Sequence, residues 1–209
     1  KDNDVIVYDD RGTIKDISDD RHLRLTRTEG LGSVPGARGI KIEKDQDGLI
    51  WIGTSDGIAV HFNPSQVFNG DINFDRVVFF DGENNEVVLE NSIITEIAID
   101  GFNRKWIGTE NSGVLLLSPD GKETILEFNI DNSPLLSNAI SAITIDDETG
   151  EVYIATAKGL ISFRGEAISG NNNLTDISIY PNPVQPDYQG GIAINGLMDN
   201  STVKITDIN

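Results

Sequence analysis

The tetrapeptide Trp-Ile-Gly-Thr occupies residues 51–54 and returns at 106–109, and a weaker copy, Tyr-Ile-Ala-Thr, occupies 153–156. The copies begin 55 and 47 residues apart. An Asp lies six or seven positions before each aromatic residue, and a Gly closes a short turn after each Thr. A period of roughly 40–50 residues is the mark of stacked structural repeats, not of one irregular domain. The chain is therefore expected to fold as a series of similar modules.

Each module is expected to contain short β-strands separated by turns. Its apolar runs are rich in β-branched and aromatic residues, and Asp, Asn and Gly fill the gaps at hairpin spacing. The expected strands are 39–44, 50–52, 58–62 in the first repeat, 93–99, 105–107, 114–117 in the second, and 140–145, 152–154, 160–163 in the third. Fourth strands are expected at 76–80 and 123–128. A four-stranded antiparallel meander at this period is the unit of a β-propeller. The expected fold class is an all-β, partial β-propeller of about three and a half blades.

The repeated aromatic residues and glycines have a structural explanation in such a fold. We expect a blade core formed by Trp51, Gly53, Trp106, Gly108 and Tyr153. The large rings would fill the space between neighbouring sheets, and the glycines would let the next sheet approach. Removing such a Trp would leave a cavity costing about 3–5 kcal/mol. The alternative is that Trp51 or Trp106 stacks on a ligand.

Composition excludes several classes of function. The net charge is −18, from 16 basic and 34 acidic residues, which disfavours nucleic acid and anionic membrane surfaces as partners. There is no Cys, so disulfides, thiolate metal sites and cysteine nucleophiles are excluded. No apolar run of about 18 residues exists, so no transmembrane segment is expected. The acidic residues gather in turns, where solubility explains them.

The chemistry of an enzyme is not apparent in the sequence. No Gly-x-Ser-x-Gly elbow, phosphate loop or dinucleotide fingerprint is present. The two histidines, His22 and His61, lie in different repeats, and the Asp-rich turn 45–48 lacks the later ligands of a calcium-binding loop. We therefore expect no catalytic residues, no metal and no cofactor. Paired carboxylates are plentiful, but no pattern places two of them across one cleft.

The chain divides into a repeat region and a different C-terminal part. We expect a partial propeller at 1–165, with a blade fragment at 1–30 and blades at 37–85, 92–130 and 138–165. A polar linker at 166–174 would lead to an incomplete β-sandwich at 175–209, with alternating strands near 176–180, 191–197 and 202–208. The sequence opens in polar residues in what reads as the middle of a blade, so we expect either that more of the protein lies outside this sequence or that these blades pack on a second copy.

These residues carry a family resemblance. The Asp-Gly turn, Ile-Trp-Ile-Gly-Thr and following apolar strand of 39–62 and 94–117 resemble the two-component regulator propeller repeat, and 140–163 is similar with Tyr for Trp and Ala for Gly. The tail, with Tyr-Pro-Asn-Pro-Val at 180–184 and apolar strands at 192–197 and 203–208, resembles the sorting domain of type IX secretion substrates in the Bacteroidetes. Together the two parts resemble the C-terminal region of a PorZ-like protein.

The resemblance implies a function by binding. It implies an exported protein at the outer-membrane surface or in the periplasm, a non-enzymatic scaffold of the type IX secretion attachment complex. Its partners would be proteins of that complex and a lipopolysaccharide or another glycan. Two alternatives stay open: the glycan-sensing periplasmic ectodomain of a hybrid two-component regulator, and a fragment of a secreted propeller enzyme that degrades polysaccharides.

The polar turns at one end of the blades are the expected binding face. Turns after each repeated Thr place Asp56, Glu110 and Lys158 at the same end of successive blades, and Arg38 precedes an inner strand near that end. Rigid strands commonly display binding residues on such loops. The four residues are thus candidate ligand-binding residues, and ordinary solvated turns are the alternative.

Overall fold

The computed structural model describes residues 4–36, 39–80, 85–165, 177–180, 193–195, 197, 201 and 203. Within these residues the regular structure is almost entirely β, in antiparallel sheets, with one short 3-10 helix, η1 (Pro64–Asn69). None of the described residues forms a helix long and apolar enough to cross a membrane. The expected all-β class is confirmed.

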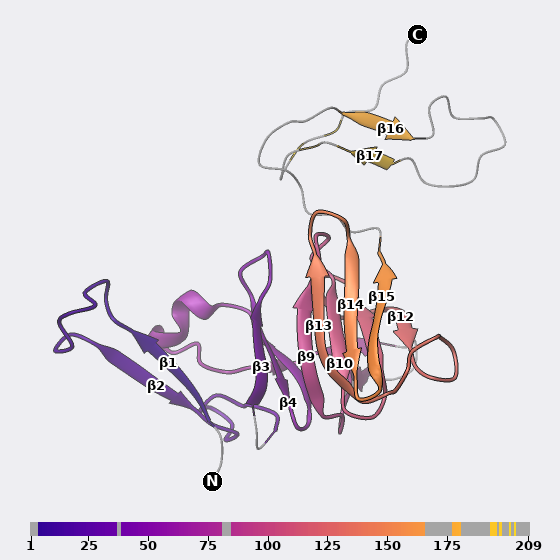
Figure 1. Cartoon of the computed structure of the whole chain (residues 1–209). Coiled ribbons are helices and arrows are strands. Elements are labelled where there is room, and N and C mark those ends of the chain that lie inside the picture. The colour runs from indigo at the N-terminus through magenta and orange to yellow at the C-terminus, as the bar shows by residue number, and fades with distance from the viewer. Residues whose placement is uncertain are drawn as a thin grey trace.

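The sheets follow one another along the chain as the blades of a partial propeller (Figure 1). The blade fragment pairs β1 (Val5–Asp9) with β2 (Arg21–Leu25). Blade 1 contains β3 (Gly39–Lys44), β4 (Ile50–Thr54), β5 (Gly57–His61) and β6 (Asp75–Arg76). Blade 2 contains β9 (Ile94–Ile99), β10 (Lys105–Thr109), β11 (Val114–Leu117) and β12 (Thr124–Phe128). Blade 3 contains β13 (Ile140–Asp146), β14 (Glu151–Thr156) and β15 (Gly159–Arg164).

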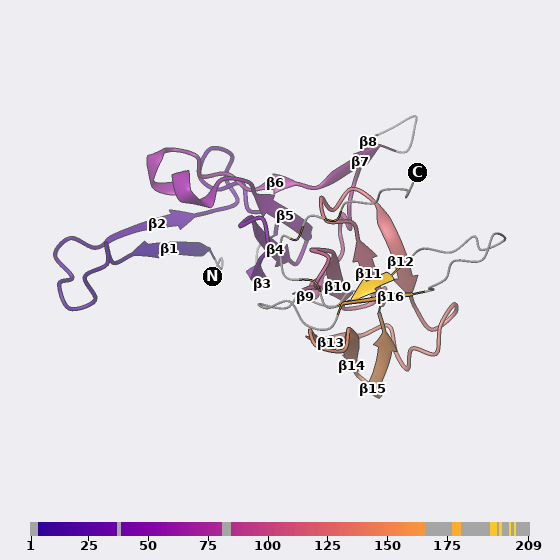
Figure 2. The ribbon, with the colours of Figure 1, turned by 90° about the horizontal axis from the view of Figure 1, so that it is seen from above.

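The three blades share one register, which shows that they are structural repeats. Each repeated aromatic residue lies opposite one residue of the first strand and one of the third: Trp51 opposite Glu43 and Val60, Trp106 opposite Ala98 and Leu116, and Tyr153 opposite Thr144 and Ser162. The first strands β3, β9 and β13 contact one another in sequence, and Figure 2 shows them side by side from above. They are therefore the inner strands of the partial ring.

Apolar side chains fill the space between successive sheets. Trp51, on the face of blade 1 that is turned to blade 2, is buried with Ile94 and Ile97 of the next sheet. Trp106 is buried in the same way against Ile140 and the rest of blade 3. The expectation that the two indoles fill the gaps between blades is confirmed.

The two repeated glycines permit the close approach of the next sheet. A Cβ added at Gly53 would lie 2.5 Å from Ile94 Cγ2, and one at Gly108 would lie 2.8 Å from Ile140 Cγ2. Real Cβ atoms do not tolerate such distances, so Ala at either position would push the neighbouring blade outward. The predicted role of these glycines is confirmed.

The third aromatic residue behaves differently. Tyr153 is 38% exposed, whereas Trp51 and Trp106 are 1% and 0% exposed. Among the described residues Tyr153 therefore lies outside the buried clusters between blades, and its place in a blade core stays a prediction. The face of blade 3 that carries Tyr153 also carries Leu160, which is exposed as well.

The fourth strand of blade 1 also differs from the expectation of a strand at 76–80. Only β6, two residues long, pairs with β5. The chain then leaves the blade at Val77, which is buried, and forms a separate hairpin of β7 (Val78–Phe80) and β8 (Asn85–Val87). The fourth strand of blade 1 is therefore short, because the apolar run continues past Val77 into a separate hairpin.

The C-terminal part is described only in places. β16 (Ser178–Tyr180) pairs antiparallel with β17 (Ala193–Asn195), and these lie within two of the three strands expected for the tail. The linker 166–174 and most of 202–208 lie outside the described residues. The proposed domain boundaries remain a prediction.

Candidate functional site

The three turns that follow the repeated Thr residues are built in the same way. The hydroxyls of Thr54, Thr109 and Thr156 each donate a hydrogen bond to the carbonyl of the glycine that closes the turn, at 3.0, 2.9 and 2.9 Å. Each hydroxyl also accepts a backbone N–H from within the turn. Side-chain caps of this kind fix a turn without regular secondary structure. The repeated Thr is therefore a device for holding these turns in place.

Two of the turns are also tied to the next blade. The N–H of Gly57 donates to the carbonyl of Ser92 at 2.8 Å, and that of Gly113 donates to Asn138 at 3.0 Å. Both acceptors lie in the segments that enter the following inner strand. These bonds place the turns of blades 1 and 2 at one end of the propeller, as expected, and attach them to a rigid scaffold.

No hydrogen bond or ion pair between described residues joins the members of the predicted binding set to one another, and the set stays a prediction. Asp56 is in an ion pair with Arg76, at 2.6 Å, and its carbonyl accepts a second guanidinium hydrogen bond at 3.2 Å. Glu110 and Lys158 are exposed on their own turns, and no interaction between described residues joins them to Asp56. Arg38 lies outside the described residues.

Three charged residues that the sequence reasoning missed lie near the same end. Arg76 holds Asp56, and Lys41 on β3 pairs with Glu96 on β9 at 2.8 Å, which joins the inner strands of blades 1 and 2. Lys41 lies opposite Gly53 in the ladder, and Glu96 lies opposite Gly108. An alignment of the first strands of blades 1 and 2 places Lys41 and Glu96 at equivalent positions, so the sequence alone could have indicated this pair of opposite charges. The described residues near this end therefore include two ion pairs.

At the opposite end, a buried ion pair joins blades 1 and 2. Asp45 Oδ2 lies 3.0 Å from Lys105 Nζ, and both side chains are fully buried. The same oxygen accepts the indole N–H of Trp51 at 2.8 Å, and the ammonium lies 4.8 Å from the centre of that ring. Lys105 also donates to the carbonyls of Asn103 and Pro119, at 2.8 and 2.5 Å.

The surroundings shift the pKa values of both partners. Burial alone raises the pKa of Asp45, but hydrogen bonds from Trp51 and Lys105 outweigh it, so the pKa lies below its ordinary value. Burial lowers the pKa of Lys105, and the contact with Asp45 partly offsets this effect. The Asp that precedes each Trp by six residues is thus an anchor for the indole, because Asp100 accepts the Trp106 N–H at 3.1 Å in the same way.

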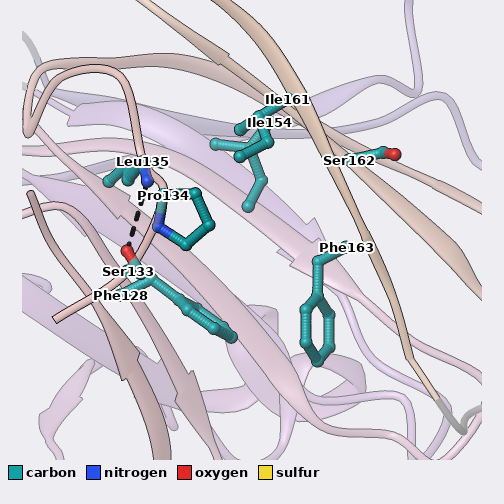
Figure 3. A pocket seen from close by; sticks show the side chains of 8 residues that line it. All are labelled: Phe128, Ser133, Pro134, Leu135, Ile154, Ile161, Ser162 and Phe163. Atoms are coloured by element: carbon teal, nitrogen blue, oxygen red, sulfur yellow. Dashed lines mark hydrogen bonds between the residues drawn. The ribbon is translucent and has the colours of Figure 1, made fainter.

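The hollows of the described surface differ in what they could hold. A cavity of about 60 Å³ between blades 2 and 3 is lined by apolar side chains from both (Figure 3). It is far smaller than the roughly 300–1,000 Å³ of small-molecule sites. Two open grooves reach that range. One, of about 500 Å³, lies beside Lys44, Asp47 and Phe62, and the other, of about 430 Å³, lies beside Phe79 and Lys122.

The two histidines of the described residues lie in different surroundings. His61 is buried, accepts the N–H of Asn63 at 3.2 Å, and lies 2.9 Å from the carbonyl of Asp71. His22 is exposed. Among the described residues, no group of three or more His, Cys, Asp or Glu side chains could hold a metal ion.

Two of the solved structures to which the chain is similar are a bacterial surface protein and an extracellular domain. One is PorZ of Porphyromonas gingivalis, an essential surface component of its type IX secretion system. It is 33% identical, with 93% of this chain and 27% of PorZ covered and a TM-score of 0.72. A second is the extracellular domain of a proposed one-component system of B. thetaiotaomicron. It is 18% identical, with 78% of this chain and 21% of that chain covered and a TM-score of 0.56, which shows the fold alone.

The chain spans about a quarter of the length of PorZ, at 27%. No protein-family model matches the chain, and no curated protein sequence matches it significantly. The comparisons with solved structures therefore support a propeller-like fold.

Proposed function

We propose that this chain is part of a non-enzymatic surface protein that acts as PorZ does, as a binding component of a type IX secretion system. The observation that carries the proposal is 33% sequence identity across 93% of the chain, together with a shared fold. A match that covers 93% of the chain leaves out too few residues to omit either the repeats or the whole tail, which resembles a sorting domain. The protein would be exported and held at the outer-membrane surface.

The structure of the blades suits a binding role. Interblade cores, capped turns and the Lys41–Glu96 pair make a stiff frame with charged groups displayed at one end. Rigid frames that present polar turns are common in recognition proteins. The proposed partners are proteins of the secretion complex and a lipopolysaccharide or another glycan, with Asp56, Glu110, Lys158 and Arg38 as proposed contact residues.

The test is made in the bacterium that encodes the chain. Deleting the gene should leave cargo proteins with C-terminal sorting domains inside the cell, and the wild-type gene should restore their export. Outer-membrane proteins that lack such a domain are the control and should be unaffected. Unchanged cargo export in the deletion strain would refute the proposal.

A sensing role is the second candidate, because the fold is also that of the extracellular domain of a proposed one-component system. Transcript profiling of the same deletion strain separates the two. A sensor should change the induction of glycan-utilisation genes and leave cargo export intact. A secretion component should do the reverse.

For the proposed contact residues, the full-length protein carrying alanine at Asp56, Glu110 and Lys158 is compared with wild type in pull-downs of the secretion complex. A variant with alanine at Lys15 and Glu148, two exposed turn residues outside the proposed contact set and outside both grooves, is the matched control. We expect the triple variant alone to lose partners. Equal recovery of partners by all three proteins would assign these turns to the solvated surface.

A further inference from the structure

One buried histidine holds both ends of the same surface loop. His61 is the last residue of β5 and is 3% exposed. Its Nε2 lies 2.9 Å from the carbonyl oxygen of Asp71, and its Nδ1 accepts the backbone N–H of Asn63 at 3.2 Å. Residues 63–71, which we call the η1 loop, contain the 3-10 helix, whose coil lies beside β1 in Figure 1. The imidazole therefore bridges the start and the end of the η1 loop.

The two contacts fix the protonation state of the ring. A carbonyl can only accept a hydrogen bond, so Nε2 of His61 carries a hydrogen. A backbone N–H can only donate, so Nδ1 carries none. Protonation would place a second N–H at Nδ1, directed at the N–H of Asn63, and two donors cannot share a hydrogen bond. The closed loop therefore requires the neutral imidazole.

The loop has few other polar connections to the blade. Among the described residues, its remaining hydrogen bonds lie within the loop itself, such as the one from the N–H of Gln66 to the carbonyl of Asn63 at 2.9 Å. Its apolar anchor is Val67, which is 6% exposed and is buried with Leu25 of β2 and Ile52 of β4. The η1 loop thus covers the apolar cluster between the blade fragment and blade 1, and His61 ties its ends to the blade.

No ion pair between described residues reaches the imidazole. The ring packs edge-on against Phe74, with 5.5 Å between the ring centroids. The three arginines on the surrounding strands are each paired with an aspartate, and the lysine and the two aspartates that complete the set are exposed. By strand register and loop contact, these charged residues are Arg21 and Arg24 of β2, Arg76 and Asp75 of β6, Lys44 of β3, and Asp71 of the loop.

We propose that the η1 loop is an acid-sensitive latch, which the neutral imidazole of His61 holds closed and which protonation of this ring releases. Opening removes Val67 from the cluster and exposes the apolar surface beneath it. The blades stay folded, because their ladders and interblade clusters do not include the loop. This device goes beyond the proposed function, since it concerns control of one surface by pH and involves none of the proposed contact residues.

The size of the effect follows from proton linkage. An unconstrained imidazole binds its proton with a midpoint near pH 6.5. Because only the open loop accommodates the charged ring, the ratio of open to closed loops rises by a factor of about 1 + 10^(6.5 − pH). This factor is about 11 at pH 5.5 and roughly 30 at pH 5.0. Ordinary carboxylates titrate near pH 4, below this range.

Amide hydrogen exchange of the full chain, followed by mass spectrometry between pH 7.5 and pH 5.0, measures the opening. After correction for the intrinsic pH dependence of exchange, the protection of residues 62–71 should fall roughly tenfold by pH 5.5 and roughly 30-fold by pH 5.0. The amides of β10 and β14 should keep their protection. Imidazole nitrogen chemical shifts of the wild-type chain should show a hydrogen on Nε2 alone at pH 7.5, and this readout needs no variant.

A neutral substitution separates the latch from general effects of acid. His61→Gln retains an amide that can donate to the Asp71 carbonyl and an oxygen that can accept from Asn63, but it does not titrate. Protection of residues 62–71 in this variant should therefore not vary with pH over the same range. His22→Gln is the matched control, because His22 is exposed on β2, and it should keep the pH dependence of the wild type.

Four results would overturn the proposal. The first is a hydrogen on Nδ1 of His61 at pH 7.5. The second is protection of residues 62–71 that stays constant between pH 7.5 and pH 5.0. The third is a His61→Gln variant that loses protection in acid as the wild type does. The fourth is a parallel loss of protection in β10 and β14, which would assign the change to unfolding of the whole chain.

Discussion

Replacing Lys105 by Met tests whether the buried ion pair holds blades 1 and 2 together. Met keeps most of the volume and flexibility of the lysine stem, so the packing against Trp51 is largely retained. The change removes only the ammonium, which contacts Asp45 Oδ2 at 3.0 Å and the carbonyls of Asn103 and Pro119 at 2.8 and 2.5 Å. The effect on stability therefore reports the electrostatic part of the interaction.

The expected loss can be estimated from these contacts. Breaking a buried pair by removing one partner costs about 3–5 kcal/mol, because the remaining charge stays buried. Asp45 still accepts hydrogen bonds from the Trp51 indole and from the N–H groups of Asp47 and Leu49, which stabilise its charge. The carbonyls of Asn103 and Pro119 lose a hydrogen-bond donor, and this increases the loss of stability. We expect a loss of about 3 kcal/mol, or a fall in Tm of roughly 6–12 °C for a chain of this size.

The assay is urea unfolding followed by circular dichroism and by the fluorescence of the two buried tryptophans. Lys122→Met is the matched control, because Lys122 is exposed and lies 3.9 Å from Asp120, and it should change stability by less than about 0.5 kcal/mol. Adding Asp45→Asn to Lys105→Met should cost less than the sum of the single changes, with a coupling of about 1–3 kcal/mol. If Lys105→Met were as stable as Lys122→Met, the pair would not hold the two blades together.

Three further predictions concern the blades. Gly108→Ala should destabilise by about 1–3 kcal/mol in thermal unfolding, because Ile140 must move; a variant as stable as wild type would show that the blades separate easily. Trp106→Ala should cost about 3–5 kcal/mol and Tyr153→Ala less than half of that, since Tyr153 is half-exposed; equal losses in urea unfolding would contradict the assigned burial. Acid should unfold the chain progressively below about pH 4, because the folded-state pKa of Asp45 lies below its unfolded value, so the stability it contributes above that value is lost as pH falls through the folded pKa. A pH titration followed by circular dichroism should show a shallower slope for Asp45→Asn, and an identical slope would contradict this assignment.

The repeat pattern was sufficient to predict most of the strands. Those around Trp51 and Trp106 agree with the expected ranges to within about two residues, because turn residues and β-branched runs act locally. The fourth strand of blade 1 could not be predicted, since the run at 76–80 has the composition of a strand whichever partner it pairs with. The burial of Tyr153 could not be predicted, because it depends on a neighbouring sheet and not on its own repeat.

The position of the repeated turns was predictable, but the ion pairs that their residues form were not. The repeated Thr turns indicated one polar end, and the structure describes three of them there. Asp56 pairs with Arg76, which lies 20 residues later. This pair could not be predicted, because it depends on where β6 joins blade 1. Lys105 looks like an ordinary exposed lysine at the start of a strand, and only its alignment with Ile50 and Val152 in the other repeats marks it as unusual.

The Lys105 contact also means that the repeats are not interchangeable units. Suppose that the segment 92–130 were duplicated in tandem. The lysine of the second copy would then pack against the first copy of blade 2, where Asp100 takes the place of Asp45. Asp100 is already paired with Arg104 at 2.7 Å. One uncompensated positive charge would then be sealed between two sheets. Recombination that lengthens this array, in the laboratory or in a genome, should therefore succeed only when the inserted module carries an aliphatic residue at the position of Lys105.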